Sequence, residues 1–197
     1  MQNILKQQSN DLVKIKGIQI LRKFNLNSKA GKILEDRMLA FLSKPLNLRL
    51  AQYSYYKELL NEMKDDFLIK EIIIANLVAT VGRSVIAQRL AGTTTYTGTI
   101  NYGALGSSAA AVSNADTQLG TEVFRKTVAS ASYTTNQAFI DFFYSKADTN
   151  GTYQEFGSFI DGTGSANTGQ LFSHVLTGGW TKLSSESMTV SCQYTIS

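Results

Sequence analysis

The sequence predicts a mainly β protein, an antiparallel β-sandwich or jelly-roll-like body with a mixed, helix-containing N-terminal region. Three observations support this fold class. Thirteen of the 15 glycines lie after residue 76, and glycine with serine and threonine is typical of short strands and tight turns. Residues 188–196 alternate strictly between apolar and polar side chains, as in a half-buried strand. Residues 54–67 instead carry apolar side chains at helical spacing.

Composition and charge divide the chain into a mixed α/β docking region, residues 1–76, and an antiparallel β-sandwich domain, residues 77–197. Residues 1–76 hold 13 Lys and Arg against 8 Asp and Glu, a net +5, and residues 77–197 hold 6 against 7, a net −1, which together give the overall +4. Charges of both signs alternate within the basic region, as at residues 35–37, without a block of like charges. We therefore expect this region to dock onto an acidic protein and expect no nucleic-acid partner.

The elements of the N-terminal region follow from their patterns. Residues 12–24 alternate on both sides of Gly17, which favours a strand with a bulge at the glycine. Residues 33–42 favour a helix, with the return arm of a hairpin as the alternative, so the sequence leaves open whether residues 12–42 form a hairpin or a helix. Residues 54–67 place Tyr56, Leu59 and Met63 on one face of an amphipathic helix.

The body contains a series of short strands separated by turn residues. We expect strands at residues 99–105, 122–133, 137–145, 153–160, 170–176 and 188–196, with a turn at 134–136 and a loop at 161–169. Residues 83–90 form the exception, since Val85, Ile86 and Leu90 lie at helical spacing and Gly92 can end a helix. Short strands at such spacing are typical of a sandwich or jelly roll.

Residues that could support catalysis are scarce. The chain has one cysteine, Cys192, and one histidine, His174, which we interpret as a surface or sheet-edge residue. A catalytic pair of carboxylates would require Asp141 and Glu155 to lie within about 10 Å of each other. Residues 148–151 resemble the start of a calcium loop but lack its later acidic ligand, and they are interpreted as a turn. We therefore expect no enzyme, no cofactor and no metal site.

One aromatic residue is a candidate for ligand binding. Trp180 follows Gly178 and Gly179, a loop-like setting in which an indole could stack on a sugar ring. Packing in a core or an interface is the alternative for such a residue. Trp180 is thus the single possible ligand-binding residue predicted by the sequence.

The chain shows no targeting or membrane signal. Lysines and arginines interrupt the only apolar stretch near the N-terminus, and no run approaches the roughly 18 apolar residues of a membrane span. We expect a soluble protein made in a reducing cytoplasm, with no membrane partner.

Several short motifs resemble those of tailed-bacteriophage virion structural proteins, in particular tail and tail-fibre-associated proteins. They are Asn76 to Arg83, Ile86 to Gly92, Ile100 to Gly106, Asp116 to Leu119 with Glu122 and Arg125, Glu155 to Gly157 with Phe159, and Gly169 to Ser173, followed by the alternating final strand. The resemblance covers roughly residues 70–197 and implies a virion component with a β-sandwich body and no enzymatic residues.

The resemblance also implies partners and a location. We expect the chain to be synthesised in a host cytoplasm and incorporated into the virion, where it contacts other virion proteins and copies of itself as a homo-oligomer. Its position is left open between tail, fibre attachment, baseplate and capsid surface. The alternative is a receptor- or glycan-binding module that contacts a host-surface glycan through Trp180 and the loop at residues 161–169.

Overall fold

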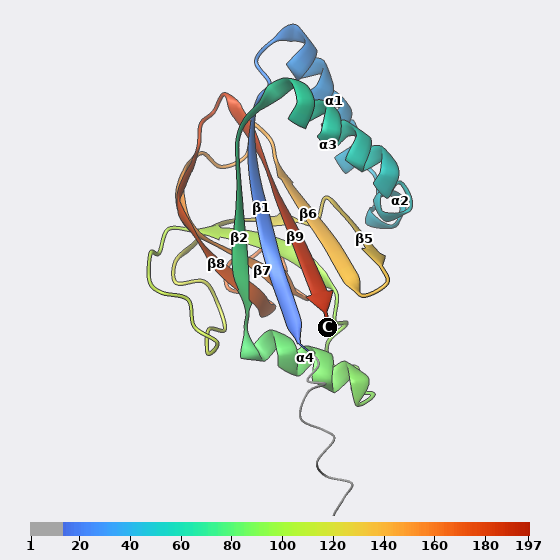
Figure 1. Ribbon diagram of the computed structural model, residues 1–197, viewed down its shortest axis with the longest axis vertical. Coiled ribbons are helices and arrows are strands. Elements are labelled where there is room, and N and C mark those ends of the chain that lie inside the picture. The colour runs from blue at the N-terminus through green and yellow to red at the C-terminus, as the bar shows by residue number, and fades with distance from the viewer. Residues whose placement is uncertain (1–13) are drawn as a thin grey trace, which may run out of the picture.

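The computed structural model describes residues 14–197 and shows a mainly β protein (Figure 1). In chain order its elements are β1 (Ile15–Asn25), α1 (Lys29–Leu42), α2 (Leu46–Ala51), α3 (Tyr53–Phe67), β2 (Leu68–Val78), α4 (Thr80–Leu90), β3 (Ile100–Gly106), β4 (Glu122–Thr127), β5 (Ser130–Thr134), β6 (Gln137–Tyr144), β7 (Gly151–Ile160), β8 (Gln170–Lys182) and β9 (Glu186–Ile196). Every strand pair is antiparallel. The predicted fold class is confirmed.

The nine strands form one curled sheet in the order β4-β3-β7-β8-β2-β1-β9-β6-β5. The sheet has two halves, and strand β2 joins them. It pairs with β1 along most of its length and with β8 only at Leu77 and Val78. We call β2, β1, β9, β6 and β5 the A half and β8, β7, β3 and β4 the B half. The two halves face each other with the main core between them.

The main core is built from the inward faces of both halves. Strand β9 contributes Met188, Val190, Cys192 and Tyr194, all buried, so the alternation in the sequence correctly predicts which face of this strand is inside. The other strands supply large side chains, among them Leu21, Phe142, Phe156, Phe172 and Trp180. Burial of so many large apolar groups supplies most of the favourable free energy that stabilises the sandwich.

A small polar network lies inside this apolar core. The hydroxyl oxygen of Tyr194 is 2.8 Å from Ser158 Oγ and 2.7 Å from Ser173 Oγ, and Gln19 Nε2 donates to Ser173 Oγ over 3.3 Å. These side chains come from β9, β7, β8 and β1. The network therefore links the two halves through hydrogen bonds that depend on their relative position.

Helices α1 and α3 cover one end of the outer face of the A half (Figure 1). A second core forms beneath them from Phe24, Leu34, Met38, Phe41, Tyr56, Leu59, Leu60, Met63 and Phe143. Ser28 caps α1 by accepting a hydrogen bond from the backbone N–H of Gly31 at 3.0 Å. The helix alternative for residues 33–42 is thus confirmed, and the hairpin alternative is wrong.

The single strand predicted over residues 122–133 is wrong, because the chain changes halves within it. Strand β4 pairs with β3 in the B half and β5 pairs with β6 in the A half. At the crossing, Arg49 of α2 donates from Nη1 to the carbonyl oxygens of Val128 and Ala129 at 2.7 and 2.9 Å. The buried guanidinium thus satisfies carbonyl groups that leave the sheet ladder at this corner.

The N-terminal region differs from expectation at two places. The bulge expected at Gly17 is absent, since β1 pairs regularly there with β2 and β9. The Asn76 amide occupies the space beside Gly17, and a Cβ at this position would displace it. Strand β2 was not predicted, and the compositional boundary at residue 76 falls inside it. Because β1 lies between β2 and β9, residues 1–76 and 77–197 contribute strands to the same sheet.

Candidate functional site

Trp180, the ligand-binding candidate, lies in the core and is only 1% exposed. Gly178 and Gly179, with φ of 70° and 82°, form a bulge in β8 opposite residues 153–155 of β7. The bulge turns the indole inward, where Nε1 donates to Met188 Sδ at 3.0 Å. The ring therefore offers no free face on which a sugar could stack.

The loop at residues 161–169 lies far from Trp180. Trp180 pairs with Tyr153 at the start of β7, and the loop follows Ile160 at its end. Seven residues of extended strand separate these ends, roughly 23 Å. The loop is also held against β4, because Arg125 Nη1 of that strand donates to the Thr163 carbonyl at 2.9 Å. The two parts of the expected glycan site thus do not form one site.

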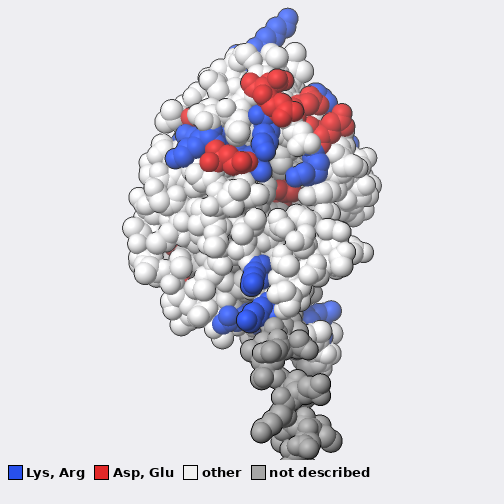
Figure 2. Space-filling view, in the orientation of Figure 1, with Lys and Arg blue, Asp and Glu red and all other residues white. Residues whose placement is uncertain are grey.

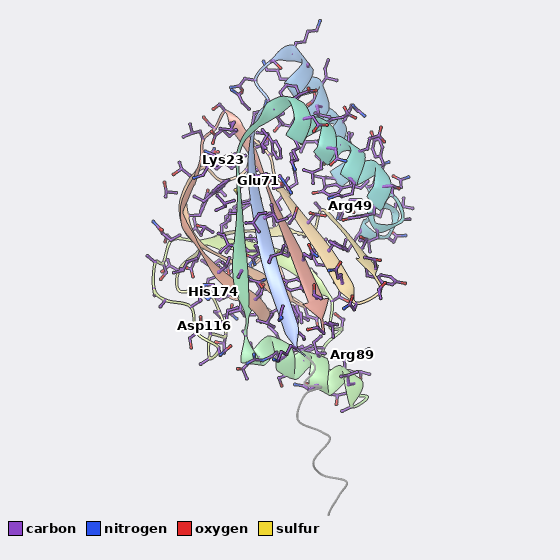
Figure 3. All side chains as sticks on the ribbon, viewed as in Figure 1. Lys23, Arg49, Glu71, Arg89, Asp116 and His174 are labelled. Atoms are coloured by element: carbon purple, nitrogen blue, oxygen red, sulfur yellow. The ribbon has the colours of Figure 1, made fainter. Side chains whose placement is uncertain are left out.

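His174 is buried, so its interpretation as a surface or sheet-edge residue is wrong. Its Nδ1 lies 2.8 Å from a carboxylate oxygen of Asp116, its neighbour in Figure 3, and its Nε2 lies 2.8 Å from one of Glu155. Glu155 also accepts hydrogen bonds from the backbone N–H groups of Ser108, Gly120 and Thr121. The array attaches the long connection between β3 and β4 to the B half.

The structure does not bring the candidate catalytic carboxylates together. Glu155 lies on the outer face of the B half beneath the connection of residues 107–121. Asp141 lies on the outer face of the A half, in a small pocket it shares with Arg22, Tyr53 and Lys57. Since packed sheets lie about 10 Å apart, carboxylates on their opposite outer faces are separated by more than that distance. Among residues 14–197, no group of three or more His, Cys, Asp or Glu side chains could hold a metal ion.

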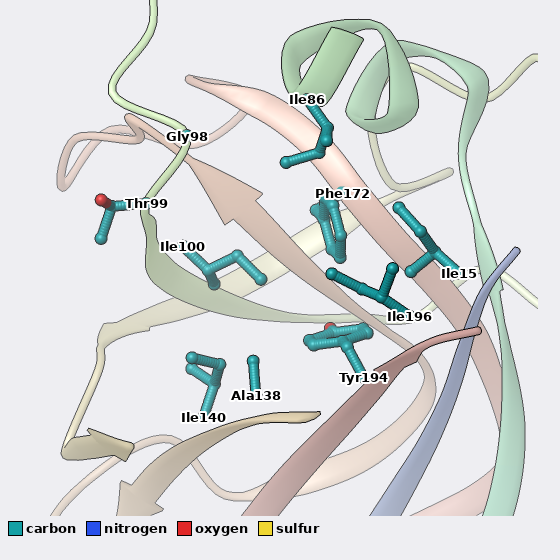
Figure 4. Close-up of a pocket in the computed structure, with 10 residues that line it drawn as sticks. All are labelled: Ile15, Ile86, Gly98, Thr99, Ile100, Ala138, Ile140, Phe172, Tyr194 and Ile196. Atoms are coloured by element: carbon teal, nitrogen blue, oxygen red, sulfur yellow. The ribbon is translucent and has the colours of Figure 1, made fainter. Parts of the chain in front are cut away.

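An apolar cavity of about 230 Å³ lies at the end of the sandwich next to α4 (Figure 4). Its wall comes mainly from five isoleucines, Ile15, Ile86, Ile100, Ile140 and Ile196, together with Phe172 and Tyr194. The Tyr194 hydroxyl is already engaged by Ser158 and Ser173. The pocket therefore has few polar groups with which to orient a ligand.

The outer face of the A half carries an apolar surface over β2 and β1, which we call the isoleucine face. It consists of Ile18 and Ile20 of β1 and Ile73 and Ala75 of β2, and it ends at β9, where Ser191 and Gln193 lie opposite Ile20 and Ile18. Ile20 is paired with Ile73 and Ile18 with Ala75, and the Ile73 side chain is 62% exposed. The ion pair between Arg22 and Glu71 borders this face toward the helices.

Charged residues are distributed around this surface and not within it. Figure 2 shows acidic and basic side chains grouped over the helical end, a few basic ones at the opposite end, and a mostly uncharged band between them. The band crosses the strands of the A half below the helices seen in Figure 1. An exposed apolar surface with a charged border is typical of a site that binds another polypeptide.

The edge of β2 beside the isoleucine face is open. Within the described part of the chain, β8 pairs with β2 only at Leu77 and Val78, so residues 70–76 have a partner strand on the β1 side alone. The space next to this edge is a groove of about 360 Å³, lined by residues 74–77 and 174–176 with Val112. This open edge and the isoleucine face together are the candidate functional site.

Sequence reasoning missed this site, although a signal was present. Ile72, Ile73 and Ile74 form a β-branched run directly after an amphipathic helix, which is typical of a strand. Among residues 14–197, no helix has the length and apolar character needed to cross a membrane. The chain matches no family model, no curated protein and no solved structure with which it was compared, so its function is inferred from its own geometry.

Proposed function

We propose that this chain is a structural component of a tailed-phage virion and that it has no catalytic role. The chain assembles with copies of itself as a homo-oligomer and binds neighbouring virion proteins. The proposal applies equally to the tail, the fibre attachment, the baseplate and the capsid surface.

The observation that supports this proposal most is the open edge of β2 beside the isoleucine face. Long sheet edges in monomeric proteins are usually blunted by lysine, proline, bulges or a covering segment, because unpaired backbone groups recruit other strands. Between Ile72 and Asn76 the β2 edge has no charged residue and no proline. A protein whose work is assembly uses such an edge as a contact surface.

A second surface suits docking onto neighbours. The short helix α2 exposes Leu46, Leu48 and Leu50, and it belongs to a region, residues 1–76, with a net charge of +5 from 13 basic and 8 acidic residues. Apolar side chains in a basic setting fit a partner surface that is acidic at its rim. This helical layer would then face a neighbouring virion protein.

The test uses phage particles produced from the genome that encodes the chain. Particles purified by density gradient are analysed by mass spectrometry for the chain and its copy number, and by electron microscopy with and without the gene. We expect several copies per particle and a missing density in the deletion particles. Absence of the chain from particles that retain their other structural proteins would overturn the proposal.

No observation favours the glycan-binding alternative as a second function. It depends on an exposed Trp180, and the indole is buried against Met188. Loss of glycan binding on substitution of Trp180 would therefore report unfolding of the core as readily as loss of a site.

A further inference from the structure

We propose that two copies of this chain pair through their β2 strands, antiparallel and two-fold symmetric, with Ile73 of one copy opposite Ile73 of the other. The pairing would join two A halves into one continuous sheet. The inference extends the proposed assembly role by naming a contact between two copies of the chain. Only the use of this contact in a particle rests on the proposed function.

Strand β2 presents a defined set of backbone groups at its open edge. Ala79 N donates to Phe172 O at 2.9 Å, just beyond the paired residues Leu77 and Val78. Along an antiparallel strand, alternate residues direct both backbone groups to the same side. Residues 77, 75, 73 and 71 therefore share the direction of Ala79, so Glu71, Ile73 and Ala75 present backbone groups at the open edge.

One alignment of the two β2 strands suits this edge better than the alignments centred on Ile72 or Ile74. Pairing of Ile73 with its own copy places Ile72 opposite Ile74, Glu71 opposite Ala75, and Lys70 opposite Asn76. All three isoleucines then meet isoleucines, and no charged side chain faces a like charge. A shift that pairs Ile72 with its own copy would place Glu71 opposite Ile73. Pairing Ile74 with its own copy would place Ile72 opposite Asn76.

A second copy of the chain is the occupant that fits this edge. The β2 edge needs an extended strand whose sequence places small or apolar residues opposite Ile72 to Ala75, and β2 itself meets that need. In a two-fold pair the isoleucine faces of both copies also become continuous, since the side chains of Ile73 and Ala75 lie on that face. Each copy thereby covers apolar surface and satisfies edge backbone groups in the same contact.

The experiment begins with the mass of the full-length chain in solution, measured by sedimentation and native mass spectrometry over a range of concentrations. We expect a dimer for the wild type. Ile73→Lys and Ile73→Glu each place like charges at the two-fold axis, and we expect each to raise the dimer dissociation constant by at least about tenfold. An equimolar mixture of the two variants should restore dimers, because the opposite charges then face each other.

The matched control is Ile33→Lys, which changes a comparably exposed isoleucine, 54% against 62%, on α1. It should leave the dimer intact. Circular dichroism of each variant separates loss of pairing from loss of folding. A monomeric wild type, or a dimer that survives Ile73→Lys, would overturn the inference, and so would a mixture that stays monomeric.

Cross-linking tests the register directly. Hydrogen-bonded residues of antiparallel strands have Cα atoms about 5.5 Å apart, within the range that a disulfide spans, so Ile73→Cys should form a covalent dimer under mild oxidation. Ala75→Cys is the control, because residue 75 would lie about 13 Å along the strand from its own copy. The native Cys192 should not interfere, since burial raises the pKa of its thiol to about 12. Equal cross-linking at both positions would overturn the register.

These results are independent of the particle experiment. A dimer in solution whose chain is absent from virions would overturn the proposed function and leave the self-pairing intact. A chain present in virions but monomeric in solution, which takes up a strand from another virion protein, would support the proposed function and overturn the self-pairing.

Discussion

The imidazole Nε2 of His174 lies 2.8 Å from a carboxylate oxygen of Glu155, and the same carboxylate accepts three backbone N–H groups from the connection of residues 107–121. Glu155 is 1% exposed, so these hydrogen bonds form away from bulk water and are worth more than exposed ones. One side chain of β7 thus fixes a long irregular segment to the B half.

Glu155→Gln should loosen this connection. The neutral amide has one acceptor oxygen in place of two and brings an N–H₂ group toward donors, so we expect a loss of about 2 kcal/mol in the free energy of unfolding. Amide hydrogen exchange at Gly120 and Thr121 should rise together with proteolysis within residues 107–121. The exposed Glu58→Gln is the control, and unchanged exchange in the Glu155 variant would contradict the assignment.

Tyr194→Phe should destabilise the sandwich without a change in its fold. Removal of the hydroxyl takes a hydrogen-bond partner from both Ser158 and Ser173 in the core, which costs about 1–3 kcal/mol in the free energy of unfolding. Urea unfolding measures the difference. Tyr133→Phe, at a residue that is 85% exposed, should be neutral, and an equal effect of both substitutions would argue against the network.

Arg49→Lys should weaken the corner between β4 and β5. A lysine ammonium lacks the planar fork of the guanidinium, whose Nη1 now serves the carbonyl groups of Val128 and Ala129. We expect a loss of about 2 kcal/mol in the free energy of unfolding, measured by urea titration. Arg83→Lys on the exposed side of α4 is the matched control. A variant as stable as the wild type would show that the corner holds without this contact.

Asp141→Asn should stabilise the protein at neutral pH but not in acid. Burial raises the pKa of the Asp141 carboxyl above its ordinary value of 3.8, and the hydrogen bond from Ser191 and the charges of Lys57 and Arg22 offset this only in part. The folded state therefore binds the proton more tightly than the unfolded chain, and stability falls as the pH rises from 3.8 through the raised pKa.

The measurement is urea unfolding of wild type and variant at about pH 3 and about pH 7. At the lower pH the carboxyl is protonated in both states and the two proteins should differ little, whereas at the higher pH the asparagine variant should be the more stable one. The exposed Asp65→Asn serves as the control. The same difference at both pH values would contradict the titration of Asp141.

Local pattern predicted much of the fold. The strict alternation of residues 188–196 identified β9 and its buried face, and helical spacing identified α3, because both signals depend on neighbours along the chain. The crossing at Val128 and Ala129 was not predictable in this way, since the corner follows from the curl of the sheet and is held by Arg49 from another part of the chain.

The candidate site was harder to predict for a related reason. In β2 the residues on both faces between Ile72 and Ile74 are isoleucines, so the alternation that identified β9 is absent. Trp180 was misleading because two adjacent glycines indicate a loop, whereas here they form a bulge within a strand. His174 meets Asp116 and Glu155 from 58 and 19 residues away, a proximity that only the tertiary structure creates.

The central place of β9 between β1 and β6 has a consequence for the order of folding during synthesis. Residues 15–25 pair with residues 186–196 along the whole of both strands, so the middle of the A half contains two strands from distant parts of the chain. While the ribosome adds residues 26–185, β1 can pair only with β2, and one side of each remains uncovered. Such long-range pairing slows folding and leaves apolar edges accessible meanwhile. Until β9 arrives, the edge of β1 is therefore open to pairing with other strands.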